Sequence, residues 1–498
     1  MSDTASDFST SSAPAERLHP LYLVTGLGKV LRNAWGLIAG AVVLGSQGRW
    51  GLVAMIAAGF VLVSIVSLLF TWLKFEYRVG ADELRIDSGF LSRNSRAIPF
   101  DRVTDVDLEQ GPLHRLFGLA RVRLETGASA GAKNEDGVLD TIALARAEAL
   151  RDHIRARRGH AIVADMAQDE AATPPLFAMD KGRVAIAGLF NFSLAVVAGL
   201  FGLTQTFGDV LGFDPFKRSF WIALADRSGP LRELMFAHQF IAVIGGAIVL
   251  ILLGIVTGMA RTLLREHGFR LDRTEAGLRR RRGLLTLTDV TVPARRVQAA
   301  IVASGPIRRA FNWCELKLQS LAMDGAKGDH VVAPLAHPDE AASILGSLGW
   351  PAAPSTGSWS NVSLAYVTSL AALLALPSLV AIVVGLLVQP LVMLWALGAL
   401  IAVAARWLSW RHTRYTLSDQ ALFVEQGWWR RRCSIVPTRN IQSIDISQNF
   451  WSRAFGICSL QLGVAGGGGF SAHHVPALRH AEGELLRARL LREPILNG

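Results

Sequence analysis

One sequence pattern occurs three times in this chain without a gap, at residues 97–118, 291–312 and 435–456. Each copy carries a proline near its start and an arginine and a phenylalanine near its end. The matching residues are Pro99, Pro293 and Pro437, then Arg115, Arg309 and Arg453, then Phe117, Phe311 and Phe455. Gly89, Gly283 and Gly427 each lie ten residues before the matching proline. A repeat of this kind predicts three domains of one fold.

A long apolar region precedes each copy. These regions cover about 34–73, then 184–207 together with 239–263, and finally 362–408. A membrane-spanning helix needs roughly 20 apolar residues, so each region can hold two spans, and we expect six. The first span, 34–44, is the weakest because it is short and rich in glycine. Buried helices of a large soluble core are the alternative, but such helices usually carry a polar stripe.

The expected organisation therefore alternates hairpins and domains. We predict a disordered tail and lead-in (1–30), a transmembrane hairpin (31–74), a first domain (75–160), a linker (161–182), a second hairpin (183–265) with an external insert (208–238), a second domain (266–350), a third hairpin (361–410) and a third domain (411–494).

Basic residues near the span ends predict the orientation. Lysines and arginines gather on the side of the termini and the repeats, which favours a cytoplasmic location for both termini and all three domains. Four bases in the insert count against this: Lys217, Arg218, Arg227 and Arg232. We find no signal peptide and expect the first apolar segment to be a retained anchor. The three cysteines are odd in number and lack metal-ligand spacing, which indicates a reducing compartment.

Within each copy, alternating residues predict two strands around the shared glycine turn, a third strand after the proline, a short helical turn, another strand and a terminal helix. This order is typical of a small barrel or bent sheet capped by its C-terminal helix. The fold class is thus α-helical transmembrane hairpins plus three α+β or β-barrel domains. We expect the shared phenylalanines to be core residues. The shared arginines brace the turn through backbone carbonyls or face a ligand.

The frame from the glycine turn through the proline to Arg–x–Phe–Gly resembles the YdbS-like bacterial pleckstrin-homology (PH) domain family. Three copies, each after a transmembrane hairpin, resemble its larger YdbT-type members. The second copy departs from the frame with Asn312 in place of glycine, so we expect a different turn there. The resemblance implies a PH-like barrel, a bacterial plasma (inner) membrane location and often a smaller one-domain companion membrane protein. It implies no catalytic reaction.

Motifs for chemistry are weak. The segment Gly26–Lys29 lacks the first glycine of a phosphate loop. His473, His474 and His480 have no acid or cysteine spaced to complete a metal site. Asn191 is the one amide well inside a span, and we expect it to make an interhelical hydrogen bond. We therefore predict no catalytic residue, no cofactor and no metal.

Two basic clusters flank the glycine turns of the second and third copies. They are Arg279, Arg280, Arg281 and Arg282, and Arg430, Arg431 and Arg432. A strand that starts at the membrane would carry the turn roughly 25 Å away, beyond the Debye length of about 8 Å. We therefore favour a solvated or interdomain face, with anionic lipid headgroups or a protein partner as alternatives. The natural interdomain partner is the acidic strand of the first domain, with Asp101, Asp105, Asp107 and Glu109.

These features favour a non-enzymatic membrane scaffold over a catalyst. It would present three cytoplasmic PH-like domains, bind a companion membrane protein or anionic lipid, and not bind nucleic acid, because neither basic run is interleaved with aromatic residues. A transporter or lipid-handling protein with a path between the hairpins is the alternative. Proton-coupled transport usually needs ionisable groups inside the spans, and these are almost lacking.

Overall fold

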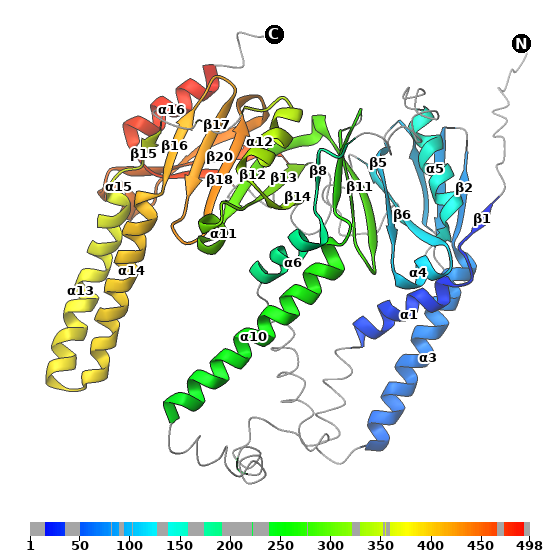
Figure 1. Ribbon diagram of the computed structural model, residues 1–498, viewed down its shortest axis with the longest axis horizontal. Helices are drawn as coiled ribbons and strands as arrows, with labels where there is room; N and C mark the ends of the chain where they lie inside the picture. Colours follow the sequence, from blue (N-terminus) through cyan, green and yellow to red (C-terminus); the bar gives the residue numbers. More distant parts are fainter. Residues whose placement is uncertain are drawn as a thin grey trace, which may run out of the picture.

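A computed structural model describes residues 15–34, 50–80, 82–88, 94–101, 103–126, 138–157, 174–191, 222, 239–275, 277–320, 329–351, 354, 359–465 and 473–492. Three domains stand in a row, and the long helices project from one side of that row (Figure 1). The domains are built alike, which confirms the three domains of one fold that the repeat predicts.

Each domain begins with a four-stranded antiparallel sheet, its first sheet. In the first domain the strands are β1 (Glu16–Arg17), β2 (Glu76–Val79), β3 (Glu83–Ser88) and β4 (Asn94–Pro99). In the second they are β8 (Phe177–Ala178), β9 (Arg270–Thr274), β10 (Gly277–Arg282) and β11 (Leu287–Pro293). In the third they are β15 (Ser360–Asn361), β16 (Arg414–Leu417), β17 (Ala421–Gln426) and β18 (Arg431–Pro437). The shared proline ends the last strand of each sheet.

A second sheet of three strands follows. In the first domain its strands are β5 (Val103–Gln110), β6 (Leu119–Thr126) and β7 (Val138–Ala143). In the second they are β12 (Val297–Ser304), β13 (Cys314–Ser320) and β14 (Asp329–Ala336), and in the third they are β19 (Ile441–Ser447), β20 (Ile457–Val464) and β21 (His473–Arg479). The 3-10 turns Ala294–Arg296 and Thr438–Asn440 precede β12 and β19. Short helices α4 (Pro112–Leu116), α11 (Pro306–Ala310) and α15 (Phe450–Ala454) carry the shared arginine. The terminal helices are α5 (Leu144–Arg157), α12 (Pro338–Ser347) and α16 (His480–Arg492).

The remaining helices that the structure describes are α1 (Tyr22–Asn33), α3 (Trp50–Lys74), α6 (Lys181–Phe190), α10 (Gln239–Glu266), α13 (Ala365–Leu387) and α14 (Met393–Arg411), with the 3-10 turn Pro390–Val392 before α14. Among the described residues, four stretches are long and apolar enough to cross a membrane: Gly51–Lys74, Ile248–Glu266, Ala365–Leu387 and Pro390–Arg411. The expected first span, and the expected third span beyond residue 191, lie outside the described residues. Within the interval 1–30, which we assigned to a disordered tail and a lead-in, β1 and α1 lie in the lead-in, and the tail 1–14 lies outside the described residues.

Each hairpin is pinned to its domain at both ends. The two-residue strand that precedes the first helix pairs with the strand that follows the second, as in Phe177 with Leu271. The same pairing joins β1 to β2 and β15 to β16. A tryptophan near the end of the second helix adds a bond: Trp72 Nε1 donates to the carbonyl of Leu18 at 3.0 Å, and Trp410 Nε1 to that of Val362 at 2.9 Å. Hairpin and domain therefore form one structural unit.

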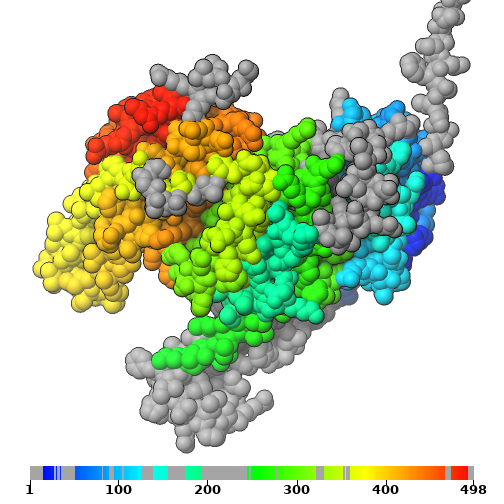
Figure 2. Space-filling view, turned by 45° about the horizontal axis from the view of Figure 1, so that its top comes forward, coloured from blue at the N-terminus to red at the C-terminus, as the bar shows by residue number. Residues whose placement is uncertain are grey.

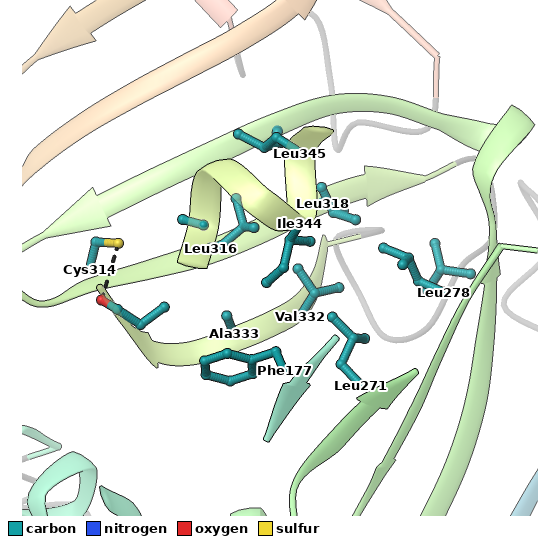
Figure 3. Packing of buried hydrophobic residues seen from close by; sticks show 14 of the residues in the cluster. Phe177, Leu271, Leu278, Cys314, Leu316, Leu318, Val332, Ala333, Ile344 and Leu345 are labelled. Carbon is teal, nitrogen blue, oxygen red and sulfur yellow. Dashed lines mark hydrogen bonds between the residues drawn. The ribbon is translucent and has the colours of Figure 1, made fainter. Parts of the chain in front are cut away.

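The core of each domain lies between its two sheets and its terminal helix. In the first domain, Leu84 from the first sheet, Leu124 from the second and Leu150 from α5 are all buried in one cluster. Figure 3 shows the equivalent core of the middle domain, in which Phe177 and Leu271 face side chains of the second sheet and α12. This cluster continues into the third domain through Phe423 and Ile435, which are fully buried.

Two local expectations were wrong. Phe117 and Phe311 are 49% and 62% exposed, so the shared phenylalanine is not a core residue; it follows the short helix on the outside of the domain. Asn312 adopts φ of 56°, close to the 64° of Gly118 and Gly456. The second copy therefore keeps the same turn, because asparagine tolerates the left-handed region better than most residues.

Candidate functional site on the underside of the domains

Adjacent domains share continuous sheets. The second sheet of one domain joins the first sheet of the next through β5 and β11, which we call the first seam, and through β12 and β18, the second seam. Both seams have the same register: Leu108 lies opposite Asp289, and the equivalent Val302 lies opposite Cys433. Figure 2 shows the middle and third domains in broad contact. The three domains are therefore joined in one row by shared sheets.

The shared arginine acts in these seams. Arg115 donates to the carbonyl of Leu284, and Arg309 donates through Nη2 to the carbonyl of Trp428 at 3.3 Å. Both acceptors directly follow the turn glycine of the next domain. The arginine thus braces a turn through a backbone carbonyl, as one of our two expectations stated, but the turn belongs to the neighbouring domain.

The glycine turn of the second domain returns to the membrane side. The amide of Gly283 donates to the carbonyl of His267 at 2.8 Å, and that of Leu284 to Leu264 at 2.9 Å, at the end of α10. Our estimate of roughly 25 Å from the membrane was wrong because two strands, and not one, precede the turn. β9 leads away from the helix end and β10 leads back. We call this helix-bearing face of the row the underside.

The short helices contact the spans on the same side. Arg308 of α11 donates to Asn191 Oδ1 at 3.2 Å, and the ring of Phe311 lies 6.4 Å from that of Phe190. Asn191 Nδ2 in turn donates to Thr262 Oγ1 of α10 at 3.1 Å, so the expected interhelical hydrogen bond is present. In the third domain, Trp451 of α15 donates to a carbonyl of α13 at 3.0 Å.

Large apolar side chains are exposed on this underside. The short helices and their ends expose Leu116, Phe311 and Phe450, of which Phe450 is 86% exposed. The turns add Leu285 and Trp429. Aromatic side chains are enriched at the level of the lipid headgroups, where an amphipathic ring can meet both phases. The bilayer surface is the apolar environment nearest to these residues, since the described spans start here.

Four arginines gather in the second seam near two carboxylates, Glu315 beside Arg308 and Arg430, and Glu425 near Arg431; we call these arginines the cationic cluster. They are Arg308, Arg309, Arg430 and Arg431. Glu315 lies 3.8 Å from Arg308 and 3.3 Å from Arg430. Burial lowers the pKa of Arg431, and the neighbouring Arg309 lowers it further. Nη1 of Arg309 and Nε of Arg431 are buried without a hydrogen-bond acceptor. The cluster therefore has excess positive charge and spare donors, which suit a phosphate or carboxylate group.

The remaining predicted arginines are engaged elsewhere. Arg279 and Arg281 bind Asp289 at 2.6 and 3.3 Å, Arg280 donates to the carbonyl of Val331, and Arg282 binds Glu266 at 2.8 Å. Arg432 lies in the second seam opposite Ala303. We expected the acidic strand of the first domain to supply carboxylates. The structure shows Asp289 of the same hairpin in this role, and it also binds Arg151 of the first domain at 3.3 Å.

The histidine group does not form a metal site among the described residues, which hold no cluster of three metal-ligating side chains. His473 is buried, and its Nε2 lies 2.7 Å from Oε1 of Gln319 across the second seam. Burial lowers the pKa of His473 to about 4, with a further contribution from Arg432. The ring is therefore neutral at pH 7 and serves as a donor between domains.

Three segments match one family model, described as "Bacterial PH domain", at residues 22–158, 232–349 and 362–494. The chain is also similar to a Bacillus subtilis (strain 168) protein named "UPF0699 transmembrane protein YdbT", with 23% identity over 321 residues. The match covers 61% of this chain and 62% of that protein, so the chain spans less than two thirds of the relative. No solved structure matches the chain.

Proposed function

Since the chain belongs to the bacterial PH domain family, with three copies of that domain beside apolar helices that cross the membrane, we propose that it is a membrane scaffold without catalytic activity. Its three domains form a row on the bilayer surface and hold anionic lipid headgroups along the underside. The cytoplasmic orientation of the row, and a companion membrane protein bound to it, belong to the same proposal.

The cationic cluster is the observation that carries this proposal. It combines four arginines with two nearby carboxylates, Glu315 and Glu425, and its Arg308 lies where α6, α10 and α11 meet. Attraction to an anionic surface contributes about 1 kcal/mol per basic residue and acts over about one Debye length. The turn of the second domain lies against the end of α10 and not roughly 25 Å away, and Arg308 of the cluster contacts Asn191 at the end of α6, so this attraction applies at the cluster.

The transporter alternative receives no support from the described spans. Their charged residues lie within the last two turns, as with Lys74 in α3 and with Arg261 and Arg265 in α10. Arg406 of α14 donates to the carbonyl of Tyr366 and lies over its ring at 3.5 Å, which places it at a helix end. Within the described residues, no ionisable group is positioned to line a path through the bilayer centre.

Lipid binding to the full chain tests the proposal. Purified protein is delipidated in neutral detergent and titrated with phosphatidylglycerol, and bound lipid is counted by native mass spectrometry. Changing Arg430 and Arg431 together to glutamine removes about 2 kcal/mol, which is roughly a 30-fold loss of affinity at low salt. The matched control changes Arg439 and Arg487, which are exposed or partly exposed away from the cluster.

The salt dependence separates electrostatic binding of phosphatidylglycerol by the cluster from lipid association that does not depend on charge. Native protein and the control should bind phosphatidylglycerol equally, lose affinity as salt rises, and prefer it over phosphatidylcholine. Equal affinity of the double variant and the native protein for phosphatidylglycerol would refute the lipid-binding part of the proposal.

A further inference from the structure

The two seams leave one surface unused at each end of the row. β5 and β12 each pair with the next domain, but their counterpart β19 ends a three-stranded sheet, β19-β20-β21, in the described part of the chain. At the other end, β4 is the outer strand of the first sheet of the first domain. We propose that β19 of one chain pairs with β4 of a second copy, so that chains join head to tail along the membrane.

The burial of equivalent residues supports an open edge at β19. Ala303 of β12 is 5% exposed because the second seam covers it, and Gln298, whose carbonyl accepts from Asn440 of the third domain, is 8% exposed. Their counterparts in the repeat, Gln442 and Ser447, are exposed. An unpaired strand edge presents a row of free backbone donors and acceptors, which favours pairing with another strand.

The edge of β4 shows the same contrast. Ala97 is exposed, while its counterparts Thr291 and Ile435 are 7% and 1% exposed. The shared register of the two existing seams specifies how the new pair would align. Val302 lies opposite Cys433 and Leu108 opposite Asp289. The equivalent residues in the proposed contact are Ile446 of one chain and Ser95 of the other.

The shared arginine is the third observation. Arg115 and Arg309 each donate to a turn carbonyl of the next domain. Arg453 has the same place in α15, but it is exposed and reaches no such carbonyl within the described residues. A second copy of this chain offers the same kind of domain that the first two arginines already bind. We therefore expect Arg453 to donate to the turn carbonyl of a domain from a second copy.

The geometry of the row allows this contact on a membrane. The domains follow one another side by side, and the described spans all project from the same face (Figure 1). A further domain added at β19 therefore keeps its own hairpin directed at the same bilayer. Because the two contact surfaces differ, the contact is heterologous and produces either a ring or an open filament. This inference does not depend on lipid binding by the cationic cluster.

Cysteine cross-linking in native membranes tests the proposed pair. The full chain carries Ile446→Cys and Ser95→Cys in a background whose native cysteines are replaced by serine, and the membranes are oxidised. We expect a ladder of dimers and larger species that reductant removes, and no ladder from either single variant. Two differently tagged chains with one cysteine each should form a heterodimer. A variant with Ile446→Cys and Ala97→Cys, two residues out of register, is the matched control and should cross-link less.

Native protein provides a second measurement that needs no substitution of buried cysteines. Mass photometry of particles extracted with their lipids should show multiples of the chain mass. Arg453→Glu should shift these to single chains, and Arg439→Glu should not. Single chains from the native protein, equal ladders for both registers, or cross-linking of the Ile446→Cys variant to another protein in place of a second copy would each overturn the proposal.

Discussion

The hydrogen bond from His473 to Gln319 predicts that acid weakens the contact between the second and third domains. The ring is 1% exposed, and burial lowers its pKa from 6.5 to about 4. Between these two pH values an unfolded or separated chain binds a proton that the native chain does not. Stability is therefore fully present above about pH 6.5 and falls as the pH decreases towards 4. The difference corresponds to roughly 3 kcal/mol.

Thermal unfolding of the full chain in lipid nanodiscs between pH 7.5 and 4.5 measures this effect. His473→Gln removes the titrating group and keeps a side-chain amide donor for Gln319. We expect the variant to lose less stability than the native protein as the pH falls, so that their difference changes by roughly 3 kcal/mol over the range. His474→Gln, on the adjacent and less buried position of β21, is the control.

Parallel pH profiles for the native protein and the His473 variant would refute this reasoning. They would mean that the ring is already charged in the folded state, or that the second seam opens without exposing it. A native profile that rises towards acid would reverse the sign and would exclude a lowered pKa.

Three further predictions address the core, the turn and the membrane topology. Phe423→Ala should lower the free energy of unfolding by about 3–5 kcal/mol because the ring of Phe423 is fully buried. The ring of Phe455 is only partly buried, so Phe455→Ala should lower the free energy of unfolding much less in the same denaturant titration. Equal losses for the two variants would contradict this. Gly283→Ala should lower the melting temperature strongly, since φ is 117° and a Cβ would lie 1.9 Å from a carbonyl oxygen; an unchanged melting temperature would show that the turn differs. Impermeant thiol reagents applied to intact spheroplasts should label Phe220→Cys and not Ser360→Cys, and the reverse pattern would invert the predicted orientation.

The repeat predicted three domains of one fold because the shared glycine, proline, arginine and phenylalanine have the same spacing in all three copies. The strands on either side of the glycine turn, the proline at a strand end and the terminal helix followed from alternation and from the missing N–H of proline, whereas the last strand before each terminal helix (β7, β14 and β21) was missed. The hydrophobic segments indicated the spans by length. These are local properties, which depend on few neighbours.

The errors concern partners that are distant in the chain. The segment that holds β9 and β10 was read as one continuous strand, so the return of the glycine turn to the membrane was missed. The strands Phe177–Ala178 and Ser360–Asn361 were also missed, because two residues are too few to show a period. Phe311 was assigned to the core because apolar residues are usually buried, but the bilayer surface is a second apolar environment. The seams could have been suspected from the shared arginine, since a residue repeated outside the core needs a repeated partner.

The shared sheets also have a consequence for synthesis on the ribosome. β5 is complete long before β11 emerges, with the whole second hairpin between them. At about 5–20 residues per second, the first domain waits roughly 10–30 seconds with its edge strand open. β12 waits in the same way for β18. After each hairpin inserts into the bilayer, a strand of the new domain pairs with the open edge strand of the domain before it. The unpaired edges are therefore covered in the order in which the domains are translated.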